Sequence, residues 1–169
     1  MLTYGEMNQS TLNLTFLEKE ARRFKVKVGV LLFLTQNDEV LLLRRFQTGI
    51  DDGMYVVPMG GLKPDETVSQ AMIREAEEET GVLLNPSQLE VCHVMHRLHQ
   101  MPDGYAFTQI DVFFRADQWE GTIVNNEPDK CDELKFFPIK ALPEATVPCI
   151  AHAIQCIQNN AFFSEFGWS

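Results

Sequence analysis

The stretch Gly60–Val82, GGLKPDETVSQAMIREAEEETGV, decides the fold of this chain. Thr67 followed three residues later by Gln70 is the signature of a capping box, which marks the start of a helix. Gly81 is a residue type at which helices commonly end. The stretch therefore predicts a helix at about residues 67–80, preceded by a loop that begins at a pair of glycines.

The second half of this helix carries carboxylates on the side that the first half gives to apolar residues. A helix turns about 100° per residue, so the azimuth of Val68, Ala71 and Met72 is taken over by three glutamates further along. These glutamates are Glu75, Glu78 and Glu79. An acidic run is usually a solvated helix face, but this one faces inward and lies at the end where the helix dipole disfavours negative charge. Hard oxygen ligands suit Mg²⁺ or Mn²⁺, so the pattern predicts a divalent-cation site.

Length, composition and charge are typical of one acidic globular domain. With 169 residues, 45% of them hydrophobic, the chain can bury one core, and we expect a single domain over residues 1–169 whose first 20 or so residues are peripheral. The formal net charge of -10 argues against nucleic-acid duplexes and membranes as partners, but not against small phosphorylated ligands. Four cysteines without CxxC spacing indicate reduced thiols. Since neither a signal peptide nor a long apolar run is apparent, we expect a cytoplasmic protein.

Strand-like segments surround the helix. Apolar residues alternate from Phe24 to Val30, the run continues to Leu34, and it resumes at Val40–Leu43 after a turn at residues 36–38, which predicts a hairpin. The other predicted elements are strands at Tyr55–Val57, Leu89–Leu98, Tyr105–Phe114 and Lys135–Ile139, and a final amphipathic helix at about Cys149–Asn160. This order predicts an α/β fold of the α+β kind, an α/β/α sandwich in which a mixed β-sheet lies between helices.

The stretch that begins at Gly60 resembles the signature of the Nudix hydrolase family, Gly-x5-Glu-x7-Arg-Glu-(aliphatic)-x-Glu-Glu-x-Gly-(aliphatic). Every glycine and every charged position of this box is present, and Ala76 is small for the aliphatic position. The family usually shows an aromatic residue followed by Pro-Gly-Gly just before the box. Here the corresponding segment is Tyr55-Val56-Val57-Pro58-Met59-Gly60-Gly61, in which Met59 interrupts the run.

The resemblance implies that the box binds divalent ions and catalyses a hydrolysis. Water would attack a phosphorus of a nucleoside diphosphate linked to another group, with Mg²⁺ or Mn²⁺ as the cofactor. The implied ligands of the ions are the backbone carbonyl of Gly60 and the carboxylates of Glu75, Glu78 and Glu79. The implied catalytic residues within the box are Glu75 and Glu78, and Glu75 is the first candidate for the general base.

Further residues gain implied roles from the same resemblance. Glu66 and Arg74 would form a structural pair, and Gly61 would let the backbone pass close to the phosphates. Outside the box, the segment that leads to Glu127 resembles a loop of MutT-like members in which a glutamate completes the metal site, so Glu127 is the second candidate for the base. Arg45 matches a position where such members place a phosphate-contacting arginine. For the last two, an ordinary surface side chain is the alternative.

Other polar and aromatic residues receive no chemical role from the sequence. On a strand His93 and His99 share a face and His96 opposes them, so ordinary strand histidines are predicted rather than a metal site. Thr146 occupies a place where MutT-like members often have a base-reading asparagine, so no specific guanine preference is implied. The phenylalanines Phe107, Phe113 and Phe114 and the stretch 162–166 are assigned to the core, although one of them or Tyr105 could stack on a base.

Residues downstream of the box narrow the substrate by elimination. Arg97 and Leu98 stand where ADP-ribose-type members tend to have a proline, Tyr105 lies too far along for the diadenosine-polyphosphate type, and the motif of NADH-type members is absent. We therefore expect a MutT-like enzyme that converts a (d)NTP, a small-molecule nucleotide, into (d)NMP and pyrophosphate. The alternatives are an ADP-ribose or nucleotide-sugar pyrophosphatase, an mRNA-decapping enzyme and a non-catalytic nucleotide sensor. A homodimer stays open, because Ala161–Trp168 could pack on the core or on a partner.

Overall fold

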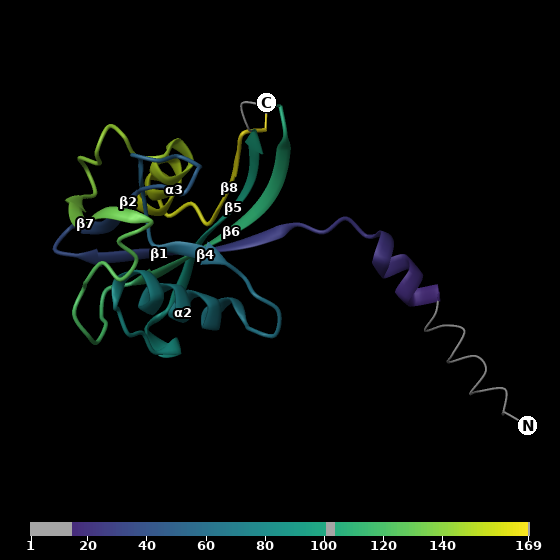
Figure 1. Ribbon diagram of the computed structural model, residues 1–169, viewed down its shortest axis with the longest axis horizontal. Coiled ribbons are helices and arrows are strands. Elements are labelled where there is room, and N and C mark those ends of the chain that lie inside the picture. Colours follow the sequence, from purple (N-terminus) through teal and green to yellow (C-terminus); the bar gives the residue numbers. More distant parts are fainter. Residues whose placement is uncertain (1–14, 101–103, 169) are drawn as a thin grey trace, which may run out of the picture.

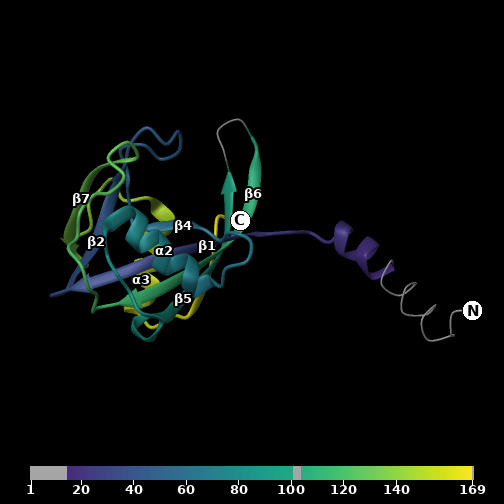
Figure 2. The ribbon, with the colours of Figure 1, turned by 60° about the horizontal axis from the view of Figure 1, so that its bottom comes forward.

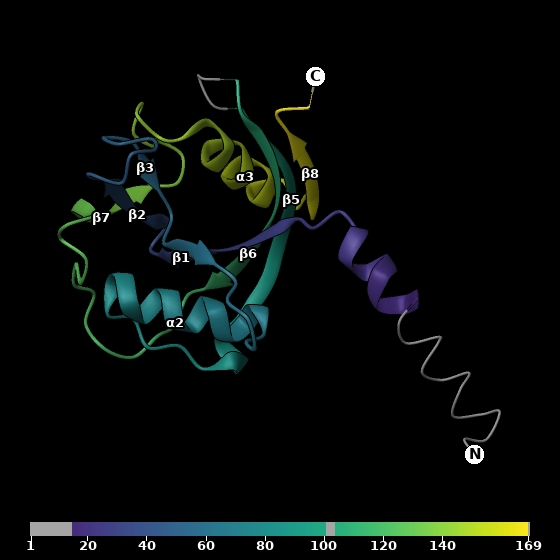
Figure 3. The same cartoon turned by 45° about the vertical axis from the view of Figure 1, so that its right-hand side comes forward.

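The computed structural model describes residues 15–100 and 104–168 of the chain. An eight-stranded sheet lies between two helices, with α2 (Val68–Thr80) on one face and α3 (Pro148–Gln158) on the other (Figures 1 and 3). The strands are β1 (Lys27–Gln36), β2 (Glu39–Arg45), β3 (Tyr55–Val56), β4 (Met59–Gly61), β5 (Glu90–Gln100), β6 (Ala106–Ala116), β7 (Cys131–Pro138) and β8 (Phe163–Phe166). The predicted sandwich with a mixed sheet is confirmed.

The sheet is mixed because its central strand β1 has neighbours of both directions. The strand order is β3-β2-β1-β6-β5-β8, with β4 paired to β1 and β7 paired to β2. β1 runs parallel to β6 and antiparallel to β2 and β4. The predicted hairpin between β1 and β2 turns on Asn37 and Asp38, which both have positive φ, as a type I′ turn requires. The alternation that begins at Phe24 overpredicted the strand, since the ladder with β6 starts only at the pair Lys27 and Gln109.

Each face of the sheet buries its own core, which explains the unbroken apolar run of β1. Leu31 and Phe33 pack in a cluster with residues of α3, whereas Val30, Leu32 and Leu34 pack in a cluster with residues of α2. A strand covered on both faces needs apolar side chains at every position rather than at every second one. The core next to α2 fixes the rotation of that helix and therefore the direction of its glutamates.

The C-terminal stretch packs on the edge of the sheet and contains a strand that the sequence did not predict. β8 pairs in parallel with β5, and the buried imidazole of His93 contacts both the carbonyl oxygen of Ala161 at 2.8 Å and Ser164 Oγ at 2.9 Å. His93 is thus an ordinary structural histidine. Phe162 and Phe163 were assigned to the core, but each leaves more than half of its surface exposed because β8 is an edge strand.

The N-terminal part of the described chain stands apart from the sandwich. Residues 15–22 form a helix that projects away from the sheet and is joined to β1 by an extended segment (Figures 1 and 2). Its Phe16 and Leu17 are exposed. Among the residues that the structure describes, no helix combines the length and the apolar character needed to cross a bilayer.

Candidate active site

The box helix begins and ends where its sequence predicts. Thr67 Oγ1 accepts a hydrogen bond from the backbone N–H of Gln70 at 3.2 Å, and Gln70 Oε1 accepts one from the N–H of Thr67 at 2.8 Å. Gly81 ends the helix in the left-handed conformation, with a φ of 69°. Three fully buried side chains hold the helix against the sheet: Ala71, Met72 and Ala76.

Arg74 ties the loop before the helix to the glutamates of the helix. Its guanidinium donates to both carboxylate oxygens of Glu66, at 3.0 and 2.8 Å, and to the carbonyl oxygen of Gly61 at 3.1 Å. The same side chain donates to Glu75 Oε1 at 2.5 Å and to Glu78 Oε2 at 3.0 Å. The hydrogen bonds from Arg74 lower the pKa of Glu66 to about 2. Glu66 therefore stays ionised and holds the loop close to the helix.

Glu79 is a partly buried carboxylate that forms no ion pair with any residue that the structure describes. Its Oε2 accepts one hydrogen bond, from the backbone N–H of Met59 on β4 at 2.8 Å. The pKa of Glu79 is raised to about 8, mainly by burial and also by the charges of Glu75 and Glu127, while the hydrogen bond from Met59 and the charge of Arg45 oppose the rise. A carboxylate in this environment is stabilised in its charged form by a bound cation.

Gly60 allows the backbone of β4 to lie directly against the helix. A Cβ atom at Gly60 would come within 1.9 Å of the carboxyl carbon of Glu75, a distance no side chain can occupy. At Gly61, by contrast, a Cβ would have no atom within 4 Å. The two neighbouring glycines therefore differ: a side chain at the first would displace the Glu75 carboxylate, and the second faces open space.

One cleft of about 380 Å³ brings together most of the side chains singled out in the sequence. It is lined by Arg45, Glu75, Glu78, Glu79 and Glu127 together with Leu43, Thr48, Met59, Lys63, Lys130 and Cys131. Arg45 is held at this cleft by hydrogen bonds from its Nε to the carbonyl of Ile50 at 2.7 Å and from Nη2 to Thr48 Oγ1 at 3.0 Å. Its neighbour Arg44 points the other way, as expected, and pairs with Asp132.

The donor set of the cleft fits a divalent cation. Carboxylate oxygens are the ligands that Mg²⁺ and Mn²⁺ prefer, and the burial of Glu79 favours a positive charge nearby. In the part of the chain that the structure describes, no three acidic, histidine or cysteine side chains converge closely enough to form a ligand set as they stand. The reason is visible in their partners, since Glu75 and Glu78 turn to Arg74, and Glu127 turns to Lys130 at 2.7 Å.

The structure places three further residues that were noted in the sequence or missed there. Thr146 is buried, its hydroxyl donates to the carbonyl of Pro143 at 2.7 Å, and it does not line the cleft. Lys130 was not predicted, although its place three residues after Glu127 is a spacing at which an ion pair forms readily. Met59, which interrupts the family's usual run, donates its backbone N–H to Glu79.

Comparison with known proteins identifies the family. The family model of the NUDIX domain matches residues 23–155, which is most of the chain. The chain belongs to the Nudix hydrolase family. The cleft lies at the end of the helix that carries the box.

Individual relatives support the assignment and differ in what they act on. NAD-capped RNA hydrolase NudC from Stutzerimonas stutzeri is 29% identical over 121 residues, covering 70% of this chain and 39% of that protein. A MutT NUDIX hydrolase from Burkholderia pseudomallei has the same fold, with a TM-score of 0.69 at 23% identity over 78% of this chain and 98% of that one. The bifunctional NMN adenylyltransferase/ADP ribose pyrophosphatase from Francisella tularensis, complexed with AMP and a Mn ion, gives a TM-score of 0.60 at 24% identity over 91% of this chain and 47% of that one. The chain spans about two fifths of the length of NudC from Stutzerimonas stutzeri.

Proposed function

We propose that this Nudix protein is a Mg²⁺- or Mn²⁺-dependent pyrophosphohydrolase that cleaves a nucleoside diphosphate linked to another group, with a (d)NTP as its best substrate and (d)NMP and pyrophosphate as products. The observation that carries the proposal is the single cleft in which Glu75, Glu78 and Glu79 of the box face Glu127 from a separate loop. Carboxylates crowded together and partly removed from water are unfavourable without a cation, and a divalent ion is the partner that nucleotide phosphates bring or require.

The residues of the cleft divide the work of hydrolysis. The carboxylates and the Gly60 carbonyl would hold a divalent ion, which would supply charge neutralisation at the phosphates and polarisation of the attacking water. Glu75 takes the proton from that water, and Glu127 is the second candidate for this role. Arg45 binds a phosphate oxygen, because two fixed hydrogen bonds already orient its guanidinium at the cleft. Gly61, with no side chain, leaves room for the phosphates beside the backbone.

The cations around the acidic cluster favour a triphosphate over a shorter phosphate chain. Arg45, Lys63 and Lys130 reach the same cleft from three different segments. Lys63 and Lys130 contact Glu78 and Glu127 respectively. When those carboxylates bind metal ions, both lysines become available to a terminal phosphate. A β,γ-diphosphate leaving group would use all three cations, whereas a sugar in its place would use fewer.

An ADP-ribose or nucleotide-sugar pyrophosphatase is the second candidate. It is supported by the likeness to the Francisella tularensis protein, whose name includes ADP ribose pyrophosphatase. A non-catalytic nucleotide sensor is disfavoured, because this chain retains every carboxylate of the box. The cytoplasmic location, the single domain over residues 1–169 and the homodimer that the sequence left open stay predictions.

A substrate panel tests the proposal. The panel contains dNTPs, NTPs, ADP-ribose, nucleotide sugars and dinucleoside polyphosphates, each with Mg²⁺ and with Mn²⁺, and the products are separated by chromatography. We expect NMP and pyrophosphate from nucleoside triphosphates. Turnover of ADP-ribose or nucleotide sugars alone would move the assignment to the second candidate, and binding without turnover across the panel would favour a sensor.

The variant Glu78→Gln connects this activity to the acidic cluster. Removing one charge from the cluster should lower metal-dependent hydrolysis by about a hundredfold or more, which is the usual scale for a group that stabilises transition-state charge. Because the Glu78 side chain is almost half exposed, folding should be little affected. Glu77→Gln is the matched control, since Glu77 lies on the same helix, is exposed and does not line the cleft. Equal activity of the two variants would overturn the metal-site assignment.

A further inference from the structure

A second, smaller cavity adjoins the acidic cleft on the side of α3. Its volume is about 160 Å³, and Arg45 and Met59 line both hollows, so the two meet at these side chains. Most of its wall is apolar, formed by residues such as Leu31 of β1, Val56 of β3 and Ile150 of α3. A cavity with apolar walls beside a phosphate site suits a planar ring attached to the phosphates through a short linker.

One wall of this cavity rests on a buried ionic group. Asp111 of β6 is 1% exposed and accepts hydrogen bonds from Arg97 Nε at 2.7 Å and from Gln109 Nε2 at 2.5 Å. Gly29 on the neighbouring strand β1 makes room for the group, because a Cβ there would lie 2.5 Å from Gln109 Nε2 and 2.7 Å from Asp111 Oδ1. A buried ion pair rarely adds stability compared with apolar packing. The group therefore calls for a role other than holding the fold together.

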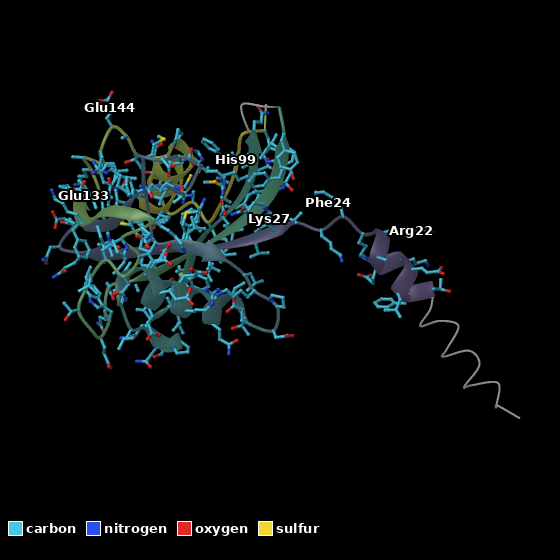
Figure 4. The ribbon with its side chains drawn as sticks, in the orientation of Figure 1. Arg22, Phe24, Lys27, His99, Glu133 and Glu144 are labelled. Carbon is cyan, nitrogen blue, oxygen red and sulfur yellow. The ribbon has the colours of Figure 1, made fainter. Side chains whose placement is uncertain are left out.

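The ionic group presents Arg97 to the cavity. Arg97 lines the cavity, whereas Asp111 lies behind it and does not. Arg97 Nη1 contacts His99 Nδ1 at 3.2 Å, and Nη2 has no hydrogen-bond partner among the residues that the structure describes. His99, labelled in Figure 4, stacks on Phe107 of β6 with ring centroids 5.0 Å apart. The guanidinium is thus fixed on one side and keeps N–H groups for a ligand on the other.

We propose that Arg97 reads the base of the substrate and selects a 6-oxopurine, such as guanine or hypoxanthine, through its O6 and N7 atoms, with Asp111 as the positioning residue. The inference rests on the proposed function, since the base enters this cavity when the phosphates lie in the acidic cleft. An arginine fork matches the two adjacent acceptors O6 and N7. Adenine carries an amino group beside N7, so it offers the arginine one hydrogen-bond acceptor and one donor, and the donor would face an N–H group of the arginine. The base preference therefore does not depend on Thr146.

Binding of nucleoside monophosphates tests the inference without any turnover. GMP, IMP, AMP and 7-deaza-GMP have no anhydride to cleave, and their affinities are measured by titration calorimetry on the whole chain with Mg²⁺ present. GMP and IMP should bind about ten- to a hundredfold more tightly than AMP, the scale of one bidentate base contact. 7-deaza-GMP, which lacks the N7 acceptor, should lose most of that advantage. Equal binding of GMP, AMP and 7-deaza-GMP overturns the inference.

The variant Arg97→Lys assigns the preference to a residue. It keeps a positive charge beside Asp111 but removes the planar fork, so the ratio of GMP to AMP affinity should fall to about twofold or less. Arg115→Lys is the matched control, because Arg115 lies on β6, packs over Phe33 and does not line this cavity. A guanine preference that survives in Arg97→Lys contradicts the proposal.

The positioning role of Asp111 has its own readout. Asp111→Asn should shrink the GMP-to-AMP ratio, whereas a merely structural residue would weaken the binding of both ligands equally. If a single variant unfolds, as removal of one partner from a buried pair can cause, the double variant Arg97→Gln/Asp111→Asn removes both charges together and carries the same test. Because binding and hydrolysis are measured separately, a guanine preference without turnover would refute the proposed function alone, and turnover without preference would refute the base reading alone.

Discussion

The acidic cleft and the cavity beside α3 share two side chains but are assembled in opposite ways. The cleft takes three of its four carboxylates, Glu75, Glu78 and Glu79, from the single helix α2, within the 23 residues of the box. The cavity takes its lining from β1, β2, β3, β4, β5, β6 and α3, which are spread over more than a hundred residues. Most of the carboxylates proposed to carry out the reaction thus lie close together in the sequence. The residues proposed to select the substrate lie far apart in the sequence and come together through strand pairing.

The largest expected effect comes from Glu79→Gln, which should separate the two regions. Metal-dependent hydrolysis should fall by at least about a hundredfold, because the partly buried carboxylate is lost from the acidic cluster. The ratio of GMP to AMP affinity should stay unchanged, because the cavity is intact. A parallel loss of the base preference would show that the two regions are not independent.

The same variant has a pH signature in the metal-free protein. Since burial raises the pKa of Glu79 from 4.5 to about 8, its ionisation lowers the stability of the folded state as the pH rises through that range. Glu79→Gln removes this loss of stability, so at pH 9 the metal-free variant should have a higher melting temperature than the parent protein. Near pH 5 the two melting temperatures should be similar. Thermal unfolding at both pH values, with a chelator present, measures it.

Gly60→Ala should have the next largest effect and acts on the packing of the box. The added methyl group would collide with the Glu75 carboxylate, so that side chain must turn away and lose its hydrogen bond from Arg74, at a cost of about 1 kcal/mol of stability and with loss of most activity. Gly61→Ala is the control for stability, because its methyl group meets no atom within 4 Å. Denaturant unfolding compares them, and equal stability of the two variants would contradict the close approach at Gly60.

The smallest effect is expected for Glu66→Gln, at low pH. Because hydrogen bonds from Arg74 lower the pKa of Glu66 to about 2, the stability that Glu66 contributes is fully present above its ordinary pKa and is lost as the pH falls towards 2. The variant lacks this contribution at neutral pH and should unfold with a weaker dependence on acid. An acid titration followed by circular dichroism measures the change. An identical acid transition in the two proteins would contradict the role of the pair.

Prediction from sequence succeeded where a feature depends on near neighbours. The capping box at Thr67, the stop at Gly81 and the turn after Gln36 all follow from residues within a few positions of one another. Prediction from sequence failed where the position of a strand at the sheet edge, or its pairing with another strand, decides whether a residue is paired or buried. The alternation from Phe24 predicts a strand that begins earlier than the ladder with β6, whose first pair is Lys27 and Gln109, and Phe163 is a strand residue whose ring remains exposed.

The sequence by itself determined the family, the sandwich of helices around a mixed sheet and the carboxylates of the box, because helix periodicity and capping turn a short pattern directly into a shared face. Only the tertiary structure decided that Glu127 and Arg45 meet those carboxylates, and that Asp111 anchors Arg97 beside the same cleft. Such residues come together through the register of strands far apart in the chain. That register is set by packing over the whole sheet, so no local pattern contains it.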